Sequence, residues 1–147
     1  MTHRWLRLTW VCRYWRAVAL ASPSLWGLIY HGKWWKSTDW LPVFLERTGS
    51  TPLDVVVVAK ERSDVILRAL PPHASNIRSL RVLECNVPVA DVMEAFSAPL
   101  AILVELVLVE DVGITFIDDD HRRATLDLPC SQLPRLLRLR LMNLHFP

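Results

Sequence analysis

Two patterns of apolar residues divide this 147-residue chain. Over residues 4–21 the apolar positions recur every three or four residues, which is helical spacing, whereas short continuous apolar runs recur from residue 53 onward and indicate buried strands. The composition changes in parallel, because all seven tryptophans lie between Trp5 and Trp40 and the later part is rich in Leu and Val. We therefore expect two segments, residues 1–36 and 37–147.

The pattern over residues 4–21 predicts one helix that is apolar on two sides. One stripe is expected to face the core, and it consists of Trp5, Leu8, Val11, Cys12, Trp15, Val18 and Ala19. Trp10 and Tyr14 lie on the opposite side. Ser22-Pro23 then ends the helix and starts a new turn, from which Leu25 and Trp26 fold back onto the first stripe. Because both sides have to be covered, Trp10 and Tyr14 either pack under the second segment or meet a partner.

The second segment contains four strand-like runs with a loose period. The stretch IRSLRVLECNV (77–87) fits the leucine-rich-repeat pattern L-x-x-L-x-L-x-x-C-x-L. The position of Leu80 in this unit is taken by Leu106 and Leu139 in later, degraded units, and by Val55 in an earlier one. The spacing between these positions is uneven, and the longest interval lies between the last two units.

Helical patterns separate these strands, over residues 40–48, 65–70 and 92–96, and the first of them ends at Gly49. Each unit therefore pairs a strand with a helix. This arrangement predicts an α/β fold, in which a short helical start precedes an irregular leucine-rich-repeat-like solenoid with a parallel sheet of about four strands.

Several stretches together resemble the F-box proteins of mushroom-forming (basidiomycete) fungi over nearly the whole chain. They are VCRYWRAVALASPSLW (11–26), LERTGSTPLDVVV (45–57), IRSLRVL (77–83), FSAPLAILVELVLVED (96–111) and LPRLLRLRLMN (133–143). In that family an N-terminal F-box docks onto the Skp adaptor of a cullin-RING ubiquitin ligase, and the leucine-rich part is expected to hold the substrate. The Leu-Pro-x-Glu helix that begins an F-box is not in this sequence, so the resemblance implies an N-terminally truncated F-box over residues 1–36.

The resemblance also implies a partner-binding surface. The residues that match the second half of the F-box are Val11, Cys12, Trp15, Pro23, Leu25 and Trp26, and the second apolar side of the first helix adds Trp10 and Tyr14. The expected partners are a Skp-type adaptor and a protein substrate. The alternative is a stand-alone or degenerate leucine-rich-repeat module that does not dock onto a ligase.

Charge adds a rival hypothesis. The net charge is only +2, but the stretch from Met1 to Trp40 carries six basic side chains, interleaved with tryptophans, and the single acid Asp39. Cations between aromatic rings are typical of single-stranded nucleic-acid binding. Helix packing and the family pattern already explain most of these tryptophans, including Trp5 and Trp15, so we expect no nucleic-acid binding and leave only Lys33-Trp34-Trp35-Lys36 without an assigned role.

Catalytic and metal-binding chemistry has little support in the sequence. Asp118-Asp119-Asp120-His121 lacks the spacing of a metal loop and is expected to be a solvated insertion. Cys85 has no histidine at a motif spacing and is expected to be a buried ladder residue. With no Gly-rich phosphate loop, we expect no enzyme activity, cofactor or metal.

The expected location is the cytoplasm or the nucleus. The cysteines Cys12, Cys85 and Cys130 are odd in number and lack CxxC spacing, which favours reduced thiols. The longest apolar run, from Pro99 to Val109, is interrupted by Glu105 and is shorter than the roughly 20 residues that cross a bilayer. No membrane interaction is therefore expected.

Overall fold

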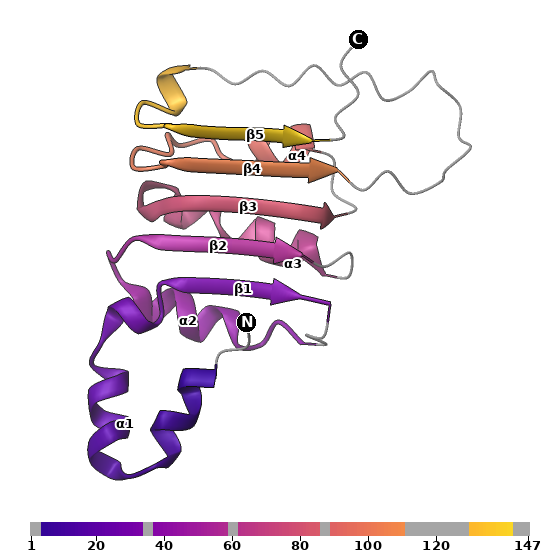
Figure 1. The fold of residues 1–147 in the computed structure, drawn as a ribbon. Coiled ribbons are helices and arrows are strands. Elements are labelled where there is room, and N and C mark those ends of the chain that lie inside the picture. Colours follow the sequence, from indigo (N-terminus) through magenta and orange to yellow (C-terminus); the bar gives the residue numbers. More distant parts are fainter. Residues whose placement is uncertain (1–3, 34–36, 59–61, 86–88, 111–129, 143–147) are drawn as a thin grey trace.

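The chain folds as a five-stranded parallel sheet with helices between the strands (Figure 1). The computed structural model describes residues 4–33, 37–58, 62–85, 89–110 and 130–142. The strands are β1 (Leu28–Gly32), β2 (Leu53–Val58), β3 (Ile77–Cys85), β4 (Glu105–Glu110) and β5 (Arg138–Met142). They lie in sequence order, and every neighbouring pair is parallel. The predicted α/β class and parallel sheet are confirmed.

Helices occupy the connections. The α-helices are α1 (Arg13–Leu20), α2 (Leu41–Thr48), α3 (Ser63–Ala69) and α4 (Val89–Glu94). Shorter 3₁₀-helices are η1 (Arg4–Trp10), η2 (Pro23–Leu25), η3 (Pro71–Asn76) and η4 (Cys130–Gln132). The three helices expected between the strands are present, and Gly49 follows α2 with a φ of 56°, a conformation that favours glycine. No helix in the described part of the chain is long and apolar enough to cross a membrane.

One face of the sheet, covered by α2, α3 and α4, forms the core. A row of fully buried side chains crosses the first four strands in register, and it consists of Ile29, Val55, Leu80 and Leu106. Leu45 of α2, Ile66 of α3 and Val92 of α4 belong to the same apolar cluster. The next position of the row on β5 is Leu139, which is 48% exposed. Coverage of the sheet by the described residues therefore weakens toward β5.

The strand β1 was not predicted, and the expected number of about four strands is wrong. Its residues lie inside the segment 1–36, which was expected to be helical. Ile29 and His31 point into the buried side while Leu28 is exposed, so the strand has the alternation of its neighbour β2. The backbone N–H of Asp54 donates a hydrogen bond of 2.8 Å to the carbonyl oxygen of Gly27, immediately before β1. The sheet therefore begins before the expected segment boundary.

The single helix expected over residues 4–21 is also wrong. The 3₁₀-helix η1 and the α-helix α1 are separated at Val11 and Cys12, and the backbone of Cys12 is extended. The Thr9 hydroxyl donates a 2.7 Å hydrogen bond to the Leu6 carbonyl oxygen, and Arg16 Nε donates one of 2.8 Å to the Thr9 carbonyl oxygen. These side chains satisfy carbonyl groups at the break, where a continuous α-helix would use backbone N–H groups.

The break changes which side chains are covered. Of the stripe expected to face the core, Ala19 is buried, whereas Val11, Trp15 and Val18 are exposed. A change of helical phase at Cys12 means that residues before and after it no longer form one stripe. Among the described residues of α1, Ala19 in the last turn is the one that is buried.

Candidate protein-binding surfaces

Exposed apolar side chains cluster on η1, α1 and the link between them. Trp10 is 78% exposed and Tyr14 is 74% exposed, although large aromatic residues are usually well buried. We define the N-terminal patch as Trp10, Val11, Tyr14, Trp15 and Val18, all of which are exposed. These five residues lie within nine positions of the sequence, and exposed apolar patches mark interaction sites in soluble proteins.

Three other residues predicted to bind a partner are also exposed. Cys12 is exposed with a free thiol, and Pro23 and Leu25 are exposed on η2. Trp26 is different, because it is only 3% exposed and its indole is part of the core. The partner-binding role of Trp26 stays a prediction, for a side chain that is buried within the chain itself, whereas its expected return onto the first helix is confirmed.

Trp26 anchors the helices that carry the patch. Its ring meets Phe44 of α2 edge-to-face at a centroid distance of 5.0 Å, and the guanidinium of Arg47 lies 4.6 Å from its centroid on the ring face. Its Nε1–H donates a 3.0 Å hydrogen bond to the carbonyl oxygen of Ala19 in α1. The end of α1 is thereby attached to the sheet domain while the patch remains outside.

A groove of about 300 Å³ lies between η1 and α1 on one side and α2 on the other. It is lined by Leu6, Thr9, Arg16, Leu20, Trp26, Trp40, Val43, Phe44 and Arg47. Most of this lining is apolar, so the groove extends the apolar surface of the N-terminal region toward the sheet domain.

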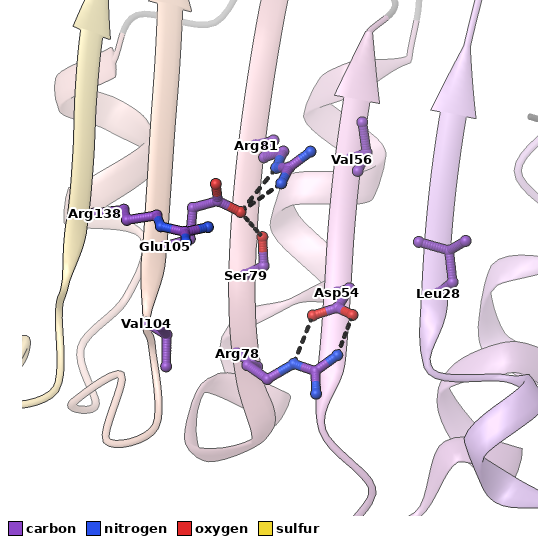
Figure 2. Close-up of a pocket in the computed structure, with 9 residues that line it drawn as sticks. All are labelled: Leu28, Asp54, Val56, Arg78, Ser79, Arg81, Val104, Glu105 and Arg138. Atoms are coloured by element: carbon purple, nitrogen blue, oxygen red, sulfur yellow. Dashed lines mark hydrogen bonds and ion pairs between the residues drawn. The ribbon is translucent and has the colours of Figure 1, made fainter.

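The second candidate surface is the face of the sheet opposite to the helices, which we call the open face. Figure 2 shows its side chains on the near side of the strands, with helices behind the sheet. In register, the first row across β1 to β5 is Leu28, Asp54, Ser79, Glu105 and Arg138. The second row is Tyr30, Val56, Arg81, Val107 and Arg140. Apolar residues prevail near β1, and arginines prevail near β5.

Two ion pairs bridge neighbouring strands on the open face (Figure 2). Arg78 meets both carboxylate oxygens of Asp54, with its Nε 3.0 Å from Oδ1. The register slips by one residue between Leu53 and Asp54 of β2, which places Arg78 outside the regular pairing and beside Asp54. The hydrogen bond and the charge of Asp54 raise the pKa of Arg78, so its guanidinium stays protonated.

Glu105 is the acceptor of the second ion pair, which it forms with Arg81. Its Oε2 accepts hydrogen bonds from Arg81 Nη2 at 2.6 Å, from Arg81 Nε at 3.0 Å and from the Ser79 hydroxyl at 3.0 Å. The hydrogen bond from Arg81 lowers the pKa of Glu105 against the opposing effect of burial, with further lowering by Ser79 and by the charge of Arg138. The Glu105 carboxylate is therefore held ionised between two strands that both carry arginine.

These residues line a shallow cavity of about 340 Å³ on the open face (Figure 2). Its lining combines the two ion pairs with the apolar side chains of Leu28, Val56 and Val104 and with Arg138. The lining offers hydrogen-bond donors, acceptors and apolar contact along one path, as protein-recognition surfaces do. Sequence reasoning assigned none of these residues to a site; the only signal was the alternation of arginine with leucine in the strands.

Several other features of the sequence lie outside the residues that the structure describes. Residues 118–121 lie outside the described residues, as do Lys33-Trp34-Trp35-Lys36 beyond Lys33 and the side chains of Cys85 and Cys130. Within the described part of the chain, no group of three His, Cys, Asp or Glu residues is placed to hold a metal ion.

Comparisons of this chain with models of known protein families, with curated protein sequences and with solved structures find no match.

Proposed function

We propose that this protein is a substrate-recognition subunit of a cullin-RING ubiquitin ligase. In this proposal the N-terminal patch docks onto a Skp-type adaptor, and the open face of the sheet holds a protein substrate. The proposal combines the resemblance to basidiomycete F-box proteins with the positions of the two surfaces, which lie on different elements and leave each other accessible.

The exposure of Trp10 and Tyr14 carries the proposal. Both aromatic rings lie on a small helical unit attached to the sheet domain through Trp26 and Ala19. Tryptophan and tyrosine are the residues that most often dominate binding energy at protein interfaces. Exposing such rings in the free chain costs free energy that binding to a partner recovers.

The test is complex formation between the purified chain and a purified fungal Skp-type adaptor. Size-exclusion chromatography with light scattering is expected to show a one-to-one complex. A complex that also forms with a Trp10→Ala/Tyr14→Ala variant would reject the N-terminal patch as the docking site. Absence of any complex would favour the alternative of a stand-alone interaction module without ligase docking.

A further inference from the structure

The open face has an uneven distribution of charge. On β3 to β5 the two rows carry three arginines, Arg81, Arg138 and Arg140, and one acid, Glu105, which gives a net charge of 3 − 1 = +2. Arg81 is already paired with Glu105. Neither Arg138 nor Arg140 forms an ion pair or a side-chain hydrogen bond with any described residue, and both are exposed.

The β1 side of the same face is apolar. Leu28 is exposed and lies beside the half-buried Tyr30 and Val56 in the two rows. The Tyr30 side chain lies over Gly32. A Cβ added to that glycine would lie 2.8 Å from both the tyrosine ring and its hydroxyl oxygen. This side offers an apolar contact with one phenol group.

We propose that the open face binds an extended segment of a partner protein that carries apolar side chains at one end and carboxylates at the other. The apolar end lies against Leu28, Tyr30 and Val56, and the carboxylates pair with Arg138 and Arg140. This inference names the class of substrate and rests on the open face being the substrate-binding part in the proposed function.

The dimensions of the sheet suit such a segment. Neighbouring strands lie about 4.8 Å apart, so the path from β1 to β5 is about 19 Å long. An extended chain advances about 3.3 Å per residue, so about six residues cover that path. Charge complementarity then fixes the direction, since Asp54 and Glu105 are neutralised by Arg78 and Arg81 while the arginines of β5 are available to the ligand.

Arginine also binds nucleic acid, but the open face favours a peptide. In the two rows of the open face, the β1 side carries aliphatic groups and a single tyrosine instead of the series of stacking rings that typically binds the bases of single-stranded nucleic acid. An acidic peptide with an apolar end complements both halves of this surface.

The experiment is selection from a displayed library of random octapeptides on the purified chain. We expect enriched sequences that combine apolar residues on one side with Asp or Glu on the other. Arg138→Gln/Arg140→Gln is the test variant, because glutamine removes the charge without placing a new acid beside Glu105. The matched control is Arg62→Gln/Arg68→Gln, which removes two exposed arginines at the start of α3 and within it, away from the open face.

Fluorescence anisotropy of the best peptide then measures the effect. Loss of two charge-assisted contacts is expected to weaken binding at least tenfold in the test variant and less than twofold in the control. Circular dichroism establishes that both variants are folded. Equal affinity for the wild type and the test variant, or a library without enrichment of acidic residues, would overturn the inference. So would tighter binding of a single-stranded oligonucleotide that depends on the same arginines.

Failure of this inference can be distinguished from failure of the proposed function, because binding to the Skp adaptor is assayed independently. A chain that binds the adaptor but selects no acidic peptide retains the proposed docking and loses the substrate class. A chain that selects acidic peptides but does not bind the adaptor retains the open face as a binding site and loses the ligase role.

Discussion

The indole N–H of Trp26 donates a 3.0 Å hydrogen bond to the carbonyl oxygen of Ala19, and this contact links the end of α1 to the sheet domain. Trp26 also packs edge-to-face on Phe44. The same residue therefore stabilises the core and fixes the helix that carries Tyr14 and Trp15.

Replacement of Trp26 separates these two roles. Trp26→Ala is expected to lower the free energy of unfolding by about 3–5 kcal/mol, as large aromatic deletions in cores do. Trp26→Phe keeps most of the apolar volume and loses the hydrogen bond, at a cost of about 1–2 kcal/mol. Urea denaturation measures both, and hydrogen exchange of α1 amides should rise in Trp26→Phe. Unchanged stability of Trp26→Ala would contradict the position of the indole in the core.

The row of buried leucines gives a second prediction with an internal control. Leu106 is fully buried and Leu139 is 48% exposed at the neighbouring register position. Leu106→Ala is expected to cost about 2–5 kcal/mol, because it opens a cavity, whereas Leu139→Ala should cost less than about 1.5 kcal/mol. Similar losses for the two variants would show that β5 is covered as fully as β4.

Glu105 makes stability depend on pH in a defined direction. Its pKa in the folded protein is lowered from the ordinary value of 4.5, first by the hydrogen bond from Arg81. Its ionised form therefore stabilises the fold above about pH 4.5, and this contribution is lost as the pH falls through the lower folded-state pKa.

Glu105→Gln is expected to lower stability by about 0.5–1 kcal/mol at pH 7, with a difference from the wild type that shrinks toward pH 3. The measurement is urea denaturation at both pH values. The control is Glu94→Gln, which alters an exposed residue of α4 outside the ion pairs formed among described residues. A difference that grows on acidification would reverse the assigned sign.

Gly27 is expected to tolerate no side chain. A Cβ at this position would lie 2.8 Å from the backbone carbonyl oxygen of Pro52, which has no flexible end that can move away. Gly27→Ala should therefore cost about 1–3 kcal/mol through displacement of backbone where β1 joins β2. Thermal unfolding compares it with Ala98→Ser at an exposed loop position, and equal midpoints would contradict the close contact.

The sequence predicts most of the sheet because its strands are apolar on the face that the helices cover. Val55, Leu80 and Leu106 are recognisable from their period and hydrophobicity. The strand at Leu28–Gly32 escaped detection because it is short, contains His31 and Gly32, and follows the tryptophan-rich helices directly. Its burial depends on pairing with β2, and no local pattern encodes that pairing.

The candidate surfaces could be predicted only in part. Spacing alone placed Trp10 and Tyr14 on a second apolar side and left open whether they pack under the later segment or meet a partner. It also continued one helix through Cys12, where side-chain hydrogen bonds at Thr9 interrupt it. The ion pairs of the open face join residues 24 positions apart, such as Arg81 and Glu105. Their proximity follows from the register of parallel strands, which a single sequence does not display.

The central claim is that the N-terminal patch docks onto a Skp-type adaptor, and titration calorimetry with a purified adaptor tests it most directly. The matched control is Leu137→Ala, which removes an 80% exposed side chain directly before β5, the edge strand opposite to β1. We predict measurable binding by the wild type and by Leu137→Ala, and at least tenfold weaker binding by a folded Trp10→Ala/Tyr14→Ala variant. Equal affinities for all three proteins would contradict the claim.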